Sequence, residues 1–102
     1  MKKHTKVWLE SRGYYLPNMT PEDLDVMCEW DGCGKVVDIN HIDPRGMGGG
    51  KGKDVPENLI GLSRKCHNNF EAKRITKEQM FKKVEEILHN RKLGELINQE
   101  IQ

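Results

Sequence analysis

The strongest constraint on the fold is a glycine-rich stretch between two short runs of β-forming residues. Five of the ten glycines lie within residues 46–52, so this stretch is expected to be an irregular loop. Before it, residues 36–42 are rich in β-branched side chains and largely alternate, which predicts a strand. After it, residues 58–62 form a second short apolar run, and Ser63 can cap a helix over residues 64–72. The sequence therefore predicts two strands and a helix around a loop.

Helices are also expected on both sides of this central segment. Residues 1–27 form an N-terminal arm, in which the Thr-Pro pair at 20–21 is typical of a helix start. Near the other end, Thr76 and Gln79 form a capping-box pattern that predicts a long helix, with a break expected near Gly94. Its apolar stripe comprises Met80, Val84, Ile87 and Leu88, followed beyond the break by Leu93, Leu96, Ile97 and Ile101.

Chain length and composition fit one small domain. The chain has 102 residues, of which 35% are hydrophobic and 32% are charged, so its apolar core must be thin. Bound metal ions often supplement cores of this size. No apolar run approaches membrane-spanning length, and the N-terminus has no signal-peptide pattern. We therefore expect a cytoplasmic protein without a membrane partner.

Positive charge is concentrated in the middle of the chain. Residues 1–40 carry five Lys or Arg against seven Asp or Glu, whereas residues 41–74 carry seven against four. Residues 75–102 are balanced, and the whole chain has a net charge of +1. A basic excess around the loop is typical of a nucleic-acid partner, and an ordinary solvated surface is the alternative.

The segment from Asp38 to Glu71 concentrates side chains suited to phosphodiester hydrolysis. This reaction needs an activated water and stabilisation of negative charge, which an imidazole and a divalent cation can supply. His67 and Glu71 are four residues apart, so they share one face of the expected helix. Asn40 and His41 are neighbours on the expected strand and point to opposite sides. One of the two can therefore face a metal while the other faces water.

The order and spacing of these residues resemble the HNH endonuclease signature, the ββα-metal motif. The resemblance rests on DINHIDPRGMGG from position 38, ENLIGL from position 57, and the pair Cys66-His67. It covers about residues 28–74 and implies an α+β, treble-clef-like domain, with residues 1–27 as an arm and residues 75–102 as a helical extension. It also implies an enzyme that hydrolyses DNA with Mg²⁺ or Mn²⁺.

The resemblance implies a role for each residue of the motif. His41 would be the general base, and Asn58 would brace the loop and orient His41. The metal site would be formed by Asn40, His67, Glu71 and Asp38. Position 40 is usually Asp or His in the family, and a neutral amide is a weaker ligand, for which Asp38 on the same strand face could compensate. Reduced metal affinity or loss of activity is the alternative.

The three cysteines also have a counterpart in this family. An odd number of clustered cysteines in a reducing compartment is more typical of metal binding than of disulfides. Many HNH domains bind a structural zinc through two cysteine pairs; here Cys28 and Cys33 supply one pair, while Ser63 and Cys66 stand in the second. Serine is a poor zinc ligand, so a fourth ligand is expected from elsewhere. The candidates are His4, His89 and a solvent molecule. The alternatives are thiols that pack without zinc, or zinc at the catalytic position.

Basic residues near the loop are expected to contact the DNA backbone. They are Arg45, Lys51, Lys53, Arg64, Lys65, Lys73 and Arg74. Backbone contacts carry no base code, so weak sequence specificity is expected. Two other functions are compatible with the sequence. One is a zinc-stabilised nucleic-acid-binding module that has lost catalysis. The other is an adaptor whose C-terminal apolar stripe pairs with a second copy or with a phage packaging partner.

Overall fold

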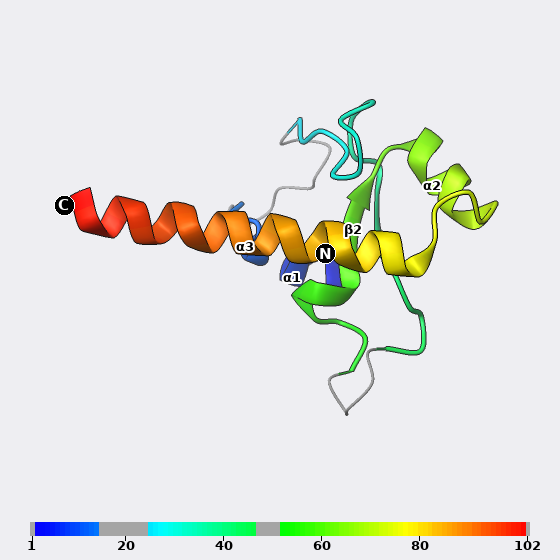
Figure 1. Cartoon of the computed structure of the whole chain (residues 1–102). Coiled ribbons are helices and arrows are strands. Elements are labelled where there is room, and N and C mark those ends of the chain that lie inside the picture. The colour runs from blue at the N-terminus through cyan, green and yellow to red at the C-terminus, as the bar shows by residue number, and fades with distance from the viewer. Residues whose placement is uncertain (1, 15–24, 47–51, 102) are drawn as a thin grey trace.

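The computed structural model describes residues 2–14, 25–46 and 52–101, with side chains described as far as residue 94. Within these residues the chain forms a small α+β structure with a two-stranded antiparallel sheet (Figure 1). The elements are α1 (Lys3–Ser11), β1 (Asp38–His41), η1 (Pro56–Asn58), β2 (Leu59–Leu62), α2 (Arg64–Glu71) and α3 (Lys77–Ile101). The predicted α+β class is therefore confirmed, and both predicted strands are present in shorter form. No described helix is long and apolar enough to cross a membrane.

The two strands pair in a register that gives the hairpin two different faces. Asp38 lies opposite Leu62, and His41 lies opposite Leu59. Because successive side chains on a strand alternate, His41 points to one face together with Ile39, while Asp38 and Asn40 point to the other. All four residues of β2 are buried, so both faces of the hairpin are covered by other elements.

Helix α1 covers the face that carries His41. Trp8 of α1 is fully buried and lies against Gly61 of β2, where an added Cβ would be 2.7 Å from the indole ring. Glycine is therefore needed at position 61 so that the indole can approach the strand. The buried side chains on this face are Trp8, Leu9, Val26, Val36, Ile39 and Leu59.

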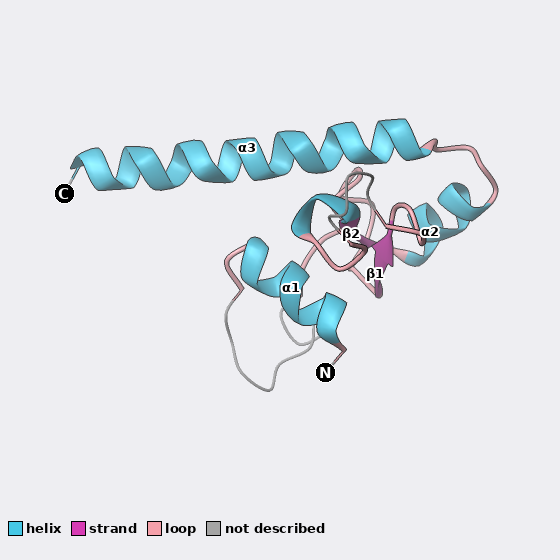
Figure 2. Ribbon diagram, turned by 90° about the horizontal axis from the view of Figure 1, so that it is seen from below, coloured by secondary structure: helices cyan, strands magenta, loops and turns pink. Residues whose placement is uncertain are grey.

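Helices α2 and α3 cover the opposite face. Figure 2 shows α3 and α1 on opposite sides of the hairpin. Of the predicted apolar stripe on α3, Met80 and Val84 are fully buried, and Leu88 packs at the edge of this core. The buried side chains here are Cys28, Ile42, Ile60, Leu62, Cys66, Ile75, Met80 and Val84. Leu96, Ile97 and Ile101 lie outside the side chains that the structure describes.

The helix starts of α2 and α3 agree with the sequence signals. Ser63 Oγ accepts a hydrogen bond from Cys66 N at 3.3 Å. Thr76 N donates to Gln79 Oε1 at 2.8 Å, and Gln79 N donates back to Thr76 Oγ1 at 3.1 Å, which completes the capping box. The predicted break near Gly94 is wrong, because α3 continues to Ile101. An isolated glycine costs a helix about 1 kcal/mol, which the remaining backbone hydrogen bonds outweigh.

Helix α1 was not predicted at residues 3–11. Its N-cap residue, Lys2, makes no side-chain capping bond, and its first turn contains no acidic residue. The sequence therefore lacks the local signals that mark a helix start. Burial of Trp8 and Leu9 stabilises the helix instead. The helix start predicted at residues 20–21 lies outside the described residues.

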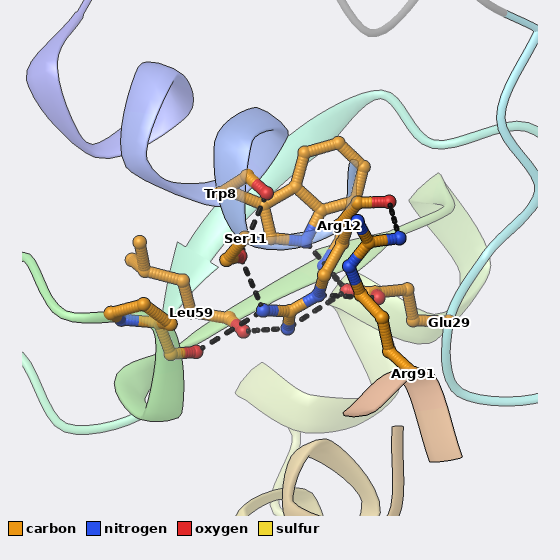
Figure 3. A network of polar contacts seen from close by, with 8 residues as sticks. Trp8, Ser11, Arg12, Glu29, Leu59 and Arg91 are labelled. Atoms are coloured by element: carbon orange, nitrogen blue, oxygen red, sulfur yellow. Dashed lines mark hydrogen bonds and ion pairs between the residues drawn. The ribbon is translucent and has the colours of Figure 1, made fainter. Parts of the chain in front are cut away.

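A buried ion pair holds α1 against the rest of the molecule (Figure 3). Arg12 Nε is 2.9 Å from Glu29 Oε2, and the two side chains are only 3% and 9% exposed. Trp8 Nε1 donates to Glu29 Oε1 at 2.6 Å, and Arg12 donates to the carbonyl oxygen of Leu59 at 2.7 Å. Arg91 of α3 donates to the Arg12 carbonyl at 3.1 Å, so the network joins four separate segments.

Candidate active site and metal centres

His41 lies on the α1 face, beside an aspartate from the far end of the loop. Its Nε2 is 2.7 Å from Asp54 Oδ1, and the two side chains are 22% and 19% exposed. The His4 ring of α1 also lies close by, with its centroid 4.7 Å from that of His41. Solvent therefore reaches the His41 imidazole, while two neighbours restrict its orientation.

Charge around His41 determines which ring nitrogen can act as a base. The hydrogen bond with His41 lowers the pKa of Asp54, and Lys3 and Lys53 lower it further. An ionised carboxylate only accepts hydrogen bonds, so the neutral His41 ring carries its proton on Nε2 and its lone pair on Nδ1. Burial, followed by the nearby His41, lowers the pKa of His4. The His4 ring is therefore favoured in its neutral form.

Asp54 was not among the predicted site residues, and His4 was considered only as a ligand of the cysteine cluster. Asp54 follows the glycine-rich loop and has no motif position that links it to His41. His4 belongs to α1, which carries no local helix signal. Both contacts join residues that are distant in sequence. No periodicity or spacing in the chain could have revealed them.

On the opposite face, His67 contacts two other predicted metal ligands, each through a different ring nitrogen, so the three side chains do not converge on one point. His67 of α2 has its Nδ1 3.6 Å from Asp38 Oδ2 of β1, and its Nε2 2.9 Å from Glu71 Oε1. The expected one-turn spacing of His67 and Glu71 is thus present on the helix. The Asp38 carboxylate is 40% exposed and that of Glu71 is 68% exposed, so solutes can reach this group.

Two buried polar atoms in this region have no hydrogen-bond partner among the described residues. They are Asn40 Nδ2 and His67 Nδ1. Buried polar atoms in proteins are nearly always paired, so an unpaired atom calls for an explanation such as a bound ion or water. Rotation of the Asn40 amide by half a turn would present its oxygen, which is the atom that can bind a metal.

Asn58 joins the two ends of the loop between the strands. Its amide donates to the carbonyl oxygens of Asp43 at 3.0 Å and Lys53 at 2.9 Å, and its oxygen accepts from Asp43 N at 2.9 Å. The residue is fully buried. Asp43 is two residues after His41, and Lys53 directly precedes Asp54. Asn58 therefore fixes the two segments that hold the His41–Asp54 pair, which is the geometry expected of a brace.

The cysteines converge at one end of the structure, with an aspartate as the fourth member. Cys33 Sγ is 3.2 Å from Cys66 Sγ, and Cys66 Sγ is 3.2 Å from Asp31 Oδ1. The ligand atoms of Cys28, Asp31, Cys33 and Cys66 all lie within 4.8 Å of one another. All three thiols are free. Three sulfurs and one carboxylate oxygen form a ligand set that zinc accepts.

Neither histidine considered as the fourth ligand belongs to the cysteine cluster, and the solvent alternative stays a prediction. His4 lies beside His41, and His89 is exposed on α3, whereas Asp31 lies next to the thiols. Asp31 is part of the tight turn that starts at Cys28, so the turn itself supplies this carboxylate. Ser63 contacts Cys33 through its hydroxyl at 3.0 Å and also caps α2.

The thiols differ in their tendency to ionise. Burial, followed by a hydrogen bond with Cys33, raises the pKa of the Cys66 thiol far above its ordinary value. Burial also opposes ionisation of Cys28, yet hydrogen bonds from the backbone near Ser63, Asp31 and Trp30 outweigh it and lower the pKa of that thiol. The Cys28 thiol therefore ionises more readily than the Cys66 thiol, and a bound cation would favour ionisation of both.

The basic residues expected to contact DNA lie mostly at the surface. Arg45 and Arg64 have side chains that are 86% and 68% exposed, and each has a carboxylate within 4 Å: Asp43 for Arg45 and Asp38 for Arg64. Lys53 and Lys65 are also exposed. Lys51 lies outside the described residues. Arg64 thus places a mobile cation next to the Asp38–His67 pair.

No family model, no curated protein sequence and no solved structure matches this chain. Three features of the chain's own residues bear on its function: His67 with its contacts to Asp38 and Glu71, the His41–Asp54 pair, and the cysteine cluster. The first two lie on opposite faces of one hairpin, and the third lies beside α2.

Proposed function

We propose that this chain is a metal-dependent endonuclease of the HNH class that hydrolyses phosphodiester bonds in DNA. The observation that supports it most strongly is the contact between His67 and Asp38. Hydrogen bonding to Glu71 places the proton of a neutral His67 ring on Nε2. Its Nδ1 lone pair then faces the Asp38 carboxylate at 3.6 Å without a donor between them.

Two electron pairs that face each other at this distance repel unless a positive charge lies between them. Either protonation of His67 or a cation shared by the two side chains would supply this charge. Two ligands bound to one ion at about 2.0–2.2 Å are about 3–3.5 Å apart, so a separation of 3.6 Å is close to that of a metal site. The unpaired Asn40 amide adds a third group suited to the same ion.

The oxygen donors in this group favour a hard cation. The carboxylate of Asp38, with the amide oxygen of Asn40, suits Mg²⁺ or Mn²⁺, while Glu71 remains hydrogen-bonded to Nε2 of His67. Such an ion would neutralise charge on the phosphate and on the leaving oxygen. Asp38 supplies the negative charge that a neutral Asn40 lacks. The departure from the usual residue at position 40 is therefore compensated two residues earlier on the same strand face.

His41 would accept the proton of the attacking water through Nδ1. Asp54 holds the proton on Nε2 and thereby keeps Nδ1 free for this role, in the same way that a carboxylate orients a catalytic histidine. We assign Asp54 as a positioning residue, because it acts through His41. Lys3 and Lys53 place positive charge near this pair, which favours the approach of a phosphate.

The two halves of the site must act on the same phosphate. Asn40 and His41 are neighbours whose side chains leave β1 on opposite sides. Within the described residues β1 pairs only with β2, so its other edge has no strand neighbour. A phosphate lying along that free edge would have the His67 group on one side and His41 on the other.

The test is cleavage of supercoiled plasmid in the presence of Mg²⁺ or Mn²⁺. Replacement His41→Ala should lower the rate by about 10²–10⁴-fold, the usual contribution of a general base. His89→Ala is the matched control, because His89 is exposed on α3 and remote from the site. Circular dichroism establishes that both variants are folded. Wild-type inactivity with several divalent metals and DNA forms would remove the enzyme proposal.

The cysteine cluster supports a second candidate, a zinc-stabilised nucleic-acid-binding module without catalysis. Its supporting observation is the complete Cys28–Asp31–Cys33–Cys66 ligand set, which exists independently of the hydrolytic groups. Elemental analysis together with a DNA-binding assay separates the two candidates. One zinc per chain with salt-sensitive DNA binding and no cleavage would favour the module.

A further inference from the structure

A second group of metal-ligating side chains surrounds His41 and lies outside the set described for hydrolysis. We propose that His4, His41 and Asp54 form a binding site for a transition-metal ion of the Zn²⁺ class. An ion bound there would prevent His41 from acting as a general base. The regulatory consequence depends on the proposed nuclease function, whereas the metal site does not.

The geometry of the three side chains converges on one point. Their ligand atoms lie within 4.8 Å of one another. The His4 and His41 rings are tilted by 51°, so they do not stack face to face. Tetrahedral ligands at about 2.0–2.1 Å from zinc are about 3.3 Å apart. The His41–Asp54 contact of 2.7 Å must therefore open by about half an ångström, a small movement for a loop carboxylate.

The ligand types select the class of ion. Two imidazoles and one carboxylate are the ligand set of zinc sites that keep one position open. Lys2, Lys3 and Lys53 act electrostatically on this cluster. Their positive charge disfavours Mg²⁺ or Ca²⁺, which are held mainly by charge and need several oxygens. An ion bound through imidazole nitrogens depends less on net negative charge.

Binding of the ion would change the tautomer of His41. The ion takes the Nε2 lone pair, at the position where the ring now shares a proton with Asp54. The neutral ring keeps one proton, which moves through solvent from Nε2 to Nδ1. Nδ1 then carries a hydrogen and cannot accept a proton from water. The same three residues thus support two exclusive states, one with His41 as a base and one with His41 as a ligand.

The site also joins two segments of the chain. His4 lies in the first turn of α1, whereas His41 ends β1 and Asp54 follows the loop. His4 is outside the segment that resembles the HNH signature, so that resemblance implies nothing about it. An ion bound here would link α1 directly to the hairpin.

The test is a Zn²⁺ titration followed by nuclear magnetic resonance of the imidazole nitrogens. The chain contains four histidines, so every ring can be followed separately. The titration starts from protein that already holds one equivalent of zinc at the cysteines. We expect the His4 and His41 signals to shift together with one midpoint, while exposed His89 does not respond. The His67 signal separately reports any Zn²⁺ binding at the opposite face of the hairpin.

The variant His4→Gln removes one ligand and leaves the His41–Asp54 pair in place. It should raise the Zn²⁺ concentration at the His41 midpoint by more than about tenfold. Even residues that only contact metal ligands typically change metal affinity by about tenfold or more when they are mutated. His89→Gln is the matched control and should leave both midpoints unchanged. A His41 midpoint that is the same in His4→Gln as in wild type, or a His4 ring that never responds, would overturn the proposal.

Activity supplies a second readout that keeps the two proposals separate. If plasmid is cleaved, added Zn²⁺ should inhibit His89→Gln more strongly than His4→Gln in the presence of Mg²⁺. Equal inhibition of the two variants would overturn the proposal that bound Zn²⁺ prevents His41 from acting as a base. If no DNA is cleaved under any condition, the ring shifts still decide whether the metal site exists.

Discussion

The two faces of the hairpin are completed in different ways. On the α1 face, an indole packs against Gly61, and a buried arginine is paired with Glu29. Trp8, Arg12 and the backbone of Gly61 all donate to that carboxylate, so the buried polar groups of this network are paired. Around this ion pair, the core is completed by protein groups.

The α2 face contains metal-ligating and polar groups that are not all paired within the described residues. It contains three thiols and an aspartate gathered at one point, and two buried polar atoms that have no partner among the described residues. A bound metal ion is one group that could satisfy sulfur and nitrogen ligands in such positions. The two regions therefore differ: protein groups pair the buried charges around Arg12 and Glu29, whereas the α2 face gathers side chains that could bind a metal.

Removal of metal from the cysteine cluster should have the largest effect in the molecule. Structural zinc in small domains contributes about 10–16 kcal/mol of apparent binding free energy, most of which is folding free energy. We expect a strong chelator to lower the unfolding temperature of the purified protein sharply and to expose the α2 side first. Thermal unfolding and hydrogen exchange measure this. An unchanged unfolding curve, with no zinc in the protein, would mean that the thiols pack without metal.

Replacement Glu29→Gln should have the next largest effect and should act on the α1 face. The change leaves the Arg12 guanidinium, which is 3% exposed, without its counter-charge. Loss of one partner of a buried ion pair typically costs about 3–5 kcal/mol. Glu10→Gln, an exposed change on α1, is the control and should have little effect. Urea denaturation with zinc present measures both variants. Equal stability of the two would show that the α1 face does not depend on this pair.

Replacement Gly61→Ala should have a moderate effect. The added methyl group would meet the Trp8 ring at 2.7 Å and Val36 at 3.1 Å, so the indole or the strand must shift. Overpacking of this kind typically costs about 1–3 kcal/mol. Tryptophan fluorescence reports the displacement of the indole together with the loss of stability. A variant as stable as the wild type would show that the α1 face is more adaptable than its packing indicates.

Replacement Gly94→Ala should have the smallest effect and the opposite sign. Position 94 lies in α3 beyond both faces, and an added Cβ meets nothing within 4 Å. Alanine in an exposed helix interior is favoured over glycine by about 0.5–1 kcal/mol. Increased helicity by circular dichroism is the expected result. A loss of helicity would instead indicate that this position makes a contact in solution.

Capping residues in the sequence correctly predicted the starts of α2 and α3. Ser63 caps α2, and Thr76 with Gln79 begins α3, because capping requires only residues that are two or three positions apart. The hairpin was predictable from β-branched runs that flank a glycine-rich loop. Helix α1 was missed because its stability comes from burial of Trp8, and burial depends on the rest of the fold.

The same distinction applies to the candidate sites. Strand alternation and helical spacing, which are properties of the local backbone, determined that Asp38 and Asn40 share a face and that His67 and Glu71 share another. The approach of Asp31 to the cysteines, of Asp54 to His41 and of His4 to both was decided only by tertiary structure. Each of the latter two contacts joins segments separated by more than one turn of any regular element, and the position of Asp31 depends on how its turn packs against α2. No repeating geometry connects such residues until the chain has folded.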